Sequence, residues 1–215
     1  MILIDFFLDL LYPPRCCFCH KITEKEKICS ACAAKLPYTK ENSRQTKLNY
    51  ISAAVSPLYY KDSVRDSLLR YKFHSATGYS KVYGQLIAKC IDENGINCDI
   101  ITYVPLSRKR QWVRGYNQAE LIANEISKHS GVPVVKLLVK VKNNPAQSGI
   151  KSPQKRKTNV LGAYKAVNSE LIGEKSVLII DDIITTGATI SECAKILRQQ
   201  GSGEIFAASL ARSKE

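Results

Sequence analysis

The segment at residues 177–189, VLIIDDIITTGAT, constrains the fold of this 215-residue chain more than any other stretch. Its first part, Val177–Ile180, is a continuous apolar run of strand length, which is typical of a parallel strand covered on both faces. Two carboxylates, Asp181 and Asp182, follow this run, at the end of the strand where open α/β sheets bind ligands. The segment therefore predicts a buried strand, a short turn and a helix, with a polar site at the turn.

The turn contains residue types that bind phosphate. A helix N-terminus carries unpaired N–H groups and the positive end of the helix dipole, so it favours an anion. The carboxylates just before it can accept hydrogen bonds from ribose hydroxyls, directly or through a hydrated Mg²⁺. Thr189 and Glu192 have the T-x-x-E spacing of a capping box, which predicts that the helix begins there. We expect the phosphate to contact Thr185, Thr186, Gly187, Ala188 and Thr189.

The order of apolar strand, acid pair and TTGAT turn resembles the phosphoribosyl-pyrophosphate (PRPP) motif of the type I phosphoribosyltransferases. The alternative is an ordinary strand–turn–helix in which Asp and Thr only form the turn. From Tyr50 onward, strand-like and helix-like segments alternate, which predicts an α/β domain with a parallel twisted sheet flanked by helices. The other expected strands are 51–60, 99–104, 161–167 and 204–210; the expected helices include 63–73, 82–91 and 119–129; and 136–142 is ambiguous.

A second polar stretch follows the expected strand 99–104, so it can share the sheet edge that carries the acid pair. Its arginines offer guanidinium forks and its lysine an ammonium group to a multiply charged phosphate. Gly115 lets the turn approach a ligand closely. A solvated basic loop is the alternative interpretation. The candidates are Arg108, Lys109, Arg110, Arg114, Gly115, Asn117 and Gln118.

The stretch at residues 143–159, NNPAQSGIKSPQKRKTN, is long, polar and rich in Ser, Pro and Lys. A long loop without secondary structure of its own is often a mobile lid over a site. Gln147, Arg156 and Asn159 are the candidates for lid contacts, and an inert surface loop is the alternative.

Two CxxC pairs lie near the start of the sequence, with nine residues between them. Cys16, Cys19, Cys29 and Cys32 can supply four thiolates to one tetrahedral Zn²⁺, which leaves no open coordination position and predicts a structural metal. Reduced cysteines in a turn-rich segment are the alternative. The resulting division is an N-terminal helix and Cys₄ zinc ribbon over 1–37, a polar linker over 38–49 and the α/β domain over 50–215.

The composition indicates a globular protein with an anionic partner. With 45% hydrophobic residues and a net charge of +13, the chain suits a phosphorylated metabolite, nucleic acid or a membrane surface. Met1–Tyr12 is apolar but too short to span a bilayer, so we expect a packed amphipathic helix, with peripheral membrane contact as the alternative. It lacks the charged start and cleavage site of a signal peptide, which predicts a cytoplasmic protein with reduced thiols.

Taken together, these motifs resemble the ComF family of competence proteins. The resemblance covers nearly the whole sequence and combines the cysteine ribbon with an Arg-Gly-aromatic-Asn-Gln motif. The motifs that carry it are Pro14–Cys19, Cys29–Cys32, Tyr60–Arg65, Tyr71–Phe73, Val104–Leu106, Arg114–Gln118, Gln147, Arg156–Asn159 and Asp181–Thr189.

The resemblance implies a cytoplasmic protein of natural transformation that binds PRPP and handles single-stranded DNA. Its partners would include a competence helicase or recombination-mediator proteins, through which it would reach the inner face of the membrane. It also implies a zinc ribbon near the place of the usual nucleobase-binding hood. Carried onto this chain, Asp181 and Asp182 would hold the ribose and the Mg²⁺ shell, and the pyrophosphate loop would be Leu106, Ser107 and Arg108, with Arg108 joining the acids in the catalytic group.

Three functions stay open at this point. The first is a transferase that moves phosphoribose to an unidentified acceptor, and the second is a non-catalytic PRPP-binding protein that handles single-stranded DNA. In the third, the zinc ribbon is a docking module for the DNA-uptake machinery. Aromatic residues near basic clusters can stack on bases, with core packing as the alternative, and they are Tyr59, Tyr60, Tyr71, Phe73, Trp112 and Tyr116.

Overall fold

The computed structural model describes residues 13–23, 27–40, 48–74, 76–144 and 158–213. The helix expected at residues 1–12 and the lid candidates Gln147 and Arg156 lie outside the described residues. None of the helices in the described part of the chain is long and apolar enough to cross a membrane.

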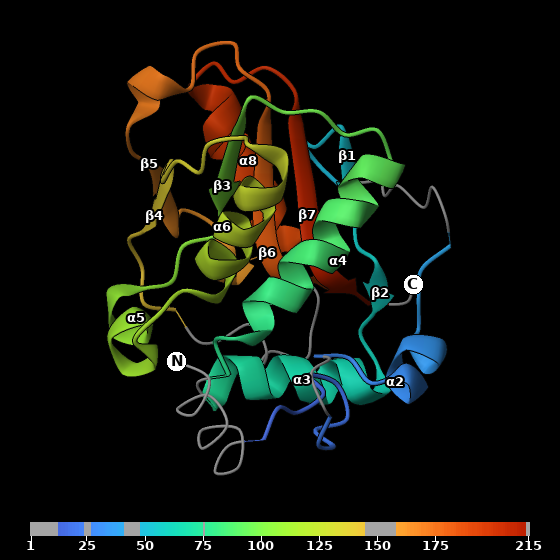
Figure 1. Ribbon diagram of the computed structural model, residues 1–215. Helices are drawn as coiled ribbons and strands as arrows, with labels where there is room; N and C mark the ends of the chain where they lie inside the picture. The colour runs from blue at the N-terminus through green and yellow to red at the C-terminus, as the bar shows by residue number, and fades with distance from the viewer. Residues whose placement is uncertain (1–12, 24–26, 41–47, 75, 145–157, 214–215) are drawn as a thin grey trace, which may run out of the picture.

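Parallel strands form the centre of the domain (Figure 1). Strand β6 (Val177–Ile184) lies between β3 (Ile100–Tyr103) and β7 (Ile205–Arg212). Strand β7 also pairs with β1 (Ala53–Val55) and with β2 (Leu58–Tyr59). Every pair in this sheet is parallel, so the strands end at one common edge.

Helices cover both faces of the sheet because the side chains of the central strand alternate between two apolar cores. Leu178 of β6 packs in the core formed with α4 (Tyr79–Glu93) and α6 (Gln118–Ser130). Ile179 packs in the second core, with α8 (Ala188–Gln199). In Figure 1, α4 and α6 lie in front of the sheet and α8 lies behind it. This is the flanked parallel sheet that the sequence predicts.

Smaller elements flank the sheet, and one of them lies at its carboxyl edge. Helix α3 (Asp62–Phe73) runs across this edge in Figure 1, with α2 (Ser30–Lys35) beyond it. An antiparallel hairpin of β4 (Leu138–Lys140) and β5 (Tyr164–Ala166) lies beside β3 and is followed by the 3₁₀ turn Ser169–Leu171. The carboxyl edge is therefore covered by α3, an early segment of the chain.

Two expected elements are divided or replaced. The strand expected at 51–60 is two strands, since Pro57 has no N–H to donate to a ladder. The basic stretch expected to be a loop contains helix α5 (Arg108–Arg114), which ends at Gly115 with a φ of +75°. None of the residues of α5 is buried, so no apolar periodicity marked this helix in the sequence.

The expected capping box is wrong. Helix α8 begins at Ala188, with Gly187 as its N-cap and no side-chain capping hydrogen bond. Glu192 Oε1 instead accepts a hydrogen bond from Gly162 N at 2.9 Å. The helix starts earlier because Gly187 adopts the left-handed conformation, which turns the chain before Thr189 is reached.

Candidate functional site

The acid pair lies within the last part of β6, one turn before α8. Asp181 Oδ1 accepts a hydrogen bond from Asp182 N at 2.8 Å. Asp182 is buried, and its Oδ1 atom lies 2.8 Å from Lys72 Nζ of α3. Burial and the charge of Asp182 raise the pKa of Asp181 to about 7, against the lowering effect of Lys72. The pair therefore concentrates negative charge that one lysine only partly neutralises.

The last turn of α3 joins the acid pair to the loop that precedes α6. Beside Lys72, which contacts Asp182, Tyr71 donates its hydroxyl to Gln118 O at 2.9 Å. The Tyr116 hydroxyl in turn donates to Tyr71 O. The sequence motif Tyr71–Phe73 therefore holds two parts of the candidate site together.

Arg114 is held in the same region. Its guanidinium lies 5.0 Å from the ring centroid of Phe73, and its Nη1 donates to Gln118 Oε1 at 3.0 Å. Burial lowers the pKa of Arg114, while the charge of Asp182 raises it. The guanidinium thus lies within electrostatic range of the acid pair and is already oriented in the free protein.

Asn117 and Gln118 have structural contacts that the sequence did not reveal. Asn117 Oδ1 accepts from Ala119 N at 3.0 Å, capping α6, and its Nδ2 donates to Val104 O at 3.1 Å. Both polar ends of Asn117 are therefore used in fixing the end of β3 against α6. Gln118 Nε2 is buried, and a side-chain hydrogen bond from Gln118 acts to lower the pKa of Tyr116 against the effect of burial.

The turn after β6 is tightly packed. Gly187 has a φ of +70°, and a Cβ at this position would lie 2.2 Å from Leu48 Cδ2. Only glycine therefore fits beneath Leu48, a residue of the expected linker. Thr186 Oγ1 accepts from Ala188 N at 3.4 Å. The remaining candidates of the turn are partly exposed: Thr185, Ala188 and Thr189.

The segment after β3 holds the described ends of the expected lid. Ser107 Oγ donates to Asn143 Oδ1 at 2.9 Å. Arg110 Nη2 donates to Asn144 O, and Asn144 Nδ2 donates to Asn159 O. These contacts bring the two described ends of the 143–159 stretch together beside α5.

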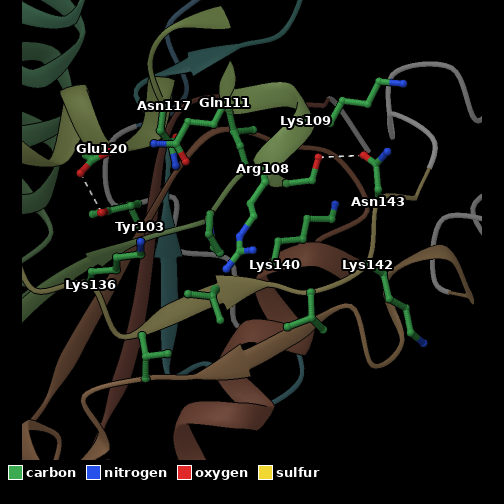
Figure 2. Close-up of a pocket in the computed structure, with 16 residues that line it drawn as sticks. Tyr103, Arg108, Lys109, Gln111, Asn117, Glu120, Lys136, Lys140, Lys142 and Asn143 are labelled. Atoms are coloured by element: carbon green, nitrogen blue, oxygen red, sulfur yellow. Dashed lines mark hydrogen bonds between the residues drawn. The ribbon is translucent and has the colours of Figure 1, made fainter. Parts of the chain in front are cut away.

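A cavity of about 690 Å³ opens on the side of α5 that faces β4 (Figure 2). Leu106, Ser107 and Arg108 line it, and Figure 2 shows the Arg108 side chain extending into it. The acid pair does not line this cavity. The candidate pyrophosphate loop therefore lines a polar region that does not include the acid pair.

Lys140 is a residue that sequence reasoning missed. Its Nζ lies 5.2 Å from the ring centroid of Tyr164 in the neighbouring strand. Burial and the charge of Arg110 lower the pKa of Lys140, and Asp181 is among the groups that raise it. Lys140 thus lies within electrostatic reach of both the acid pair and α5. Its stretch of sequence, 136–142, had no clear pattern, and nothing distinguished Lys140 from the two other lysines there, Lys136 and Lys142.

The four cysteines of the two CxxC pairs form one cluster. The Sγ atoms of Cys16, Cys19, Cys29 and Cys32 lie within 4.8 Å of one another. Cys29 N donates to Cys16 Sγ at 3.4 Å. Burial raises the pKa of the Cys16 thiol, but hydrogen bonds from backbone N–H groups, chiefly those of Cys19 and Cys29, outweigh it and lower the pKa to about 6. The arrangement fits a tetrahedral metal bound by thiolates.

The first knuckle is anchored on α3. Arg70 Nη2 donates to Cys17 O at 3.0 Å and to Phe18 O at 2.6 Å. Ser67 Oγ also donates to Cys17 O. Burial raises the pKa of the Cys17 thiol to about 12, so this cysteine is a core thiol. Because Arg70 and Lys72 both belong to the last turns of α3, this helix connects the cysteine cluster to the acid pair.

Comparisons with known sequences agree with this architecture. A family described as "Double zinc ribbon domain" matches residues 7–43, and one described as "Phosphoribosyl transferase domain" matches residues 114–215. The adenine phosphoribosyltransferase of Thermoanaerobacter pseudethanolicus has 20% identity and a TM-score of 0.40 over 66% of this chain and 83% of that one, too low to assign a fold by itself. The parallel sheet and the family matches define a phosphoribosyltransferase-like α/β protein with an N-terminal zinc ribbon.

A relative that matches over nearly its whole length identifies the family. Competence protein F of Haemophilus influenzae is 30% identical over 92% of this chain and 90% of its own length. The chain belongs to this family, the ComF family of competence proteins, as its motifs predict. Competence protein ComFC of Bacillus subtilis is 27% identical over 66% of the chain and 56% of that protein. DNA utilization protein YhgH of Escherichia coli is 31% identical over 50% of the chain and 46% of that protein.

Proposed function

We propose that the protein binds PRPP, or a closely related phosphoribosyl ligand, together with Mg²⁺, and that this binding serves the handling of single-stranded DNA in natural competence. The observation that carries the proposal is the position of Asp181 and Asp182 on β6, directly before the Thr185–Thr189 turn. The DNA part rests on relatives named for competence and for DNA utilization. A net charge of +13 is consistent with both anionic partners.

Each part of the site has a role in this proposal. The Thr185–Thr189 turn and the N-terminus of α8 bind the 5-phosphate, and Asp181 and Asp182 accept the ribose hydroxyls. Leu106–Arg108 contacts the pyrophosphate. The carboxylate oxygens suit Mg²⁺. Asp182 Oδ1 already lies 2.8 Å from a cationic group, the Nζ of Lys72. Bound Mg²⁺ would neutralise charge on the pyrophosphate.

A transferase is the second candidate, because the same residues would support it. Departure of pyrophosphate from C1 leaves positive charge on the ribose, which the carboxylates of Asp181 and Asp182 would stabilise. Arg108 would stabilise the negative charge on the leaving group.

Calorimetric titration of PRPP with Mg²⁺, followed by measurement of pyrophosphate release with and without single-stranded DNA, tests the proposal. We expect saturable binding that the Asp181→Asn/Asp182→Asn variant loses. The matched control is Asp66→Asn/Asp92→Asn, which changes two exposed acids away from the turn. Unchanged affinity in the first variant would overturn the site. Binding without release favours a PRPP-dependent DNA-handling protein, whereas release that requires a base or DNA identifies a transferase.

We also propose that the cysteine cluster holds one structural Zn²⁺ and that the chain divides into 1–37, 38–49 and 50–215. The close approach of the four thiols supports the metal, as does the zinc-ribbon match. Metal analysis should find one zinc per chain, lost in Cys32→Ala and retained in Cys98→Ala. Zinc-free protein purified without chelators would refute the site. We place the protein in the cytoplasm, with membrane contact only through competence partners such as a helicase or recombination mediator.

A further inference from the structure

The structure separates the aromatic residues near basic clusters into buried and exposed groups. Tyr71 is fully buried, whereas Phe73 is 57% exposed and Trp112 is 86% exposed. The Arg114 guanidinium, which follows Trp112 on α5, lies over the ring of Phe73 at 5.0 Å. An exposed phenylalanine thus lies under an arginine of the same short helix that carries the exposed tryptophan, and we call this group the aromatic platform (Phe73, Trp112 and Arg114).

The platform is carried by a strongly basic helix. Helix α5 has the sequence RKRQWVR, with four cationic residues and no acidic one. None of its residues is buried, so its apolar side chains Trp112 and Val113 are not explained by packing in the core. A helix of seven residues is only about 10 Å long, so its cationic and aromatic groups are within reach of one short ligand.

The same helix also lines the cavity, through Arg108, Lys109 and Gln111 (Figure 2). Its charged lining is one arginine and four lysines against one carboxylate. That carboxylate, Glu120, accepts a hydrogen bond from the Tyr103 hydroxyl at 2.7 Å. Figure 2 shows Arg108, Lys136 and Lys140 around the opening. The cavity thus offers phosphate groups a positive surface on the helix that carries Trp112 and Arg114.

We propose that α5 is the single-stranded DNA contact of this protein: bases stack on Trp112 and Phe73, and phosphates follow Arg108, Lys109 and Lys136 into the cavity. Binding sites for single strands combine stacking side chains with a positive groove for the backbone, and α5 brings both together. The inference rests on the proposed function and adds the face on which the DNA lies. Because Arg108 also belongs to the candidate pyrophosphate loop, the DNA would lie beside the PRPP site.

A second copy of the chain is a less suitable occupant of this surface. In a symmetric dimer the same patch meets itself, so two α5 helices with four cationic residues each would lie against one another. Nothing acidic on α5 would offset this repulsion. A polyanion with flat bases matches both the charge and the aromatic side chains.

The chain has one tryptophan, so fluorescence excited at a wavelength that tyrosine does not absorb reports on Trp112 alone. Titration with an oligothymidylate of about 20 nucleotides, long enough to exceed a single-strand site, should quench this fluorescence in a saturable way. Inorganic polyphosphate, an anion without bases, should compete for the site without the same quenching. Anisotropy of a labelled oligothymidylate then gives affinities for the variants.

We expect Trp112→Ala and Phe73→Ala each to weaken oligothymidylate binding about tenfold. Tyr38→Ala removes an aromatic side chain that is 50% exposed elsewhere and should change nothing. Lys136→Ala should instead reduce the slope of the logarithm of affinity against the logarithm of salt concentration by about one. The Trp112→Ala variant should bind PRPP with the affinity of the unchanged protein, because Trp112 belongs neither to the acid pair nor to the Thr185–Thr189 turn.

Failure of the inference is distinguishable from failure of the proposed function. If the unchanged protein binds PRPP but no oligothymidylate, the DNA part of the proposed function fails and this inference fails with it. If Trp112→Ala binds the oligonucleotide as tightly as the unchanged protein, only the inference is overturned. A dimer that Trp112→Ala converts to monomers, with DNA affinity intact, would assign the platform to self-association and also overturn the inference.

Discussion

Lys72 Nζ lies 2.8 Å from Asp182 Oδ1, and the two side chains are only 18% and 12% exposed. Removal of one partner leaves the other charge largely buried without compensation. We expect Lys72→Met to lower the free energy of unfolding by about 1–3 kcal/mol or more in chemical denaturation. The control Lys89→Met breaks the exposed pair with Glu93 and should cost less than about 1 kcal/mol. Equal effects of the two substitutions would contradict a buried pair.

The pKa of Asp181, raised from 3.8 to about 7, predicts a specific pH dependence. Between these two values the folded protein holds a proton that the unfolded chain has lost, so this group's contribution to stability falls as the pH rises and is level above about 7. Thermal unfolding of Asp181→Asn, whose amide does not titrate, should therefore show a smaller loss of stability over this range. Parallel profiles for the two proteins would show that Asp181 ionises normally.

Arg70 predicts that the cysteine cluster depends on α3. Its guanidinium donates to Cys17 O and Phe18 O within the first knuckle, and groups that orient metal ligands strongly affect metal affinity. Arg70→Met should weaken zinc binding about tenfold or more in competition with a chromogenic chelator. Arg65→Met, on the exposed side of the same helix, is the control. Identical zinc affinities would remove Arg70 from this role.

Gly187 and Leu48 predict a measurable coupling. Gly187→Ala combines left-handed strain with a clash against Leu48, whereas Gly131→Ala has a similar φ of +75° and open space around it. We expect Gly131→Ala to cost about 1–2 kcal/mol of stability and Gly187→Ala to cost more. Adding Leu48→Ala to Gly187→Ala should recover only the part of the lost stability that is due to the clash. Strict additivity in this double-mutant cycle would show that Leu48 does not cover the turn.

The sequence predicted the central sheet well because its strands are buried on both faces and appear as continuous apolar runs. The run beginning at Val177 is part of β6, and the helices with an apolar stripe, such as α8, occur near their expected positions. The cysteine cluster was also predictable, because two CxxC pairs at this spacing are typical of four thiolates around one metal ion.

Other features depend on contacts between distant residues. The ion pair of Lys72 could not be predicted from its motif, because its partner Asp182 is far away in the sequence. The structural use of Asn117 follows from a cap and a bond to Val104, neither of which appears in composition or spacing. Helix α5 has no buried residue, so the periodicity that identifies helices was missing. These roles require the folded arrangement.

The pairing of β1 and β2 with β7 delays completion of the sheet during synthesis. Ala53 pairs in register with Phe206, and Leu58 with Ala211, so the earliest strands of the sheet are joined to the last one described. During synthesis these strands lack this partner until residues 205–212 have emerged. Such long-range pairing slows folding and leaves apolar strands exposed on the nascent chain. A chain interrupted before β7 would therefore be a target for chaperones and proteases, whatever the state of its ligand site.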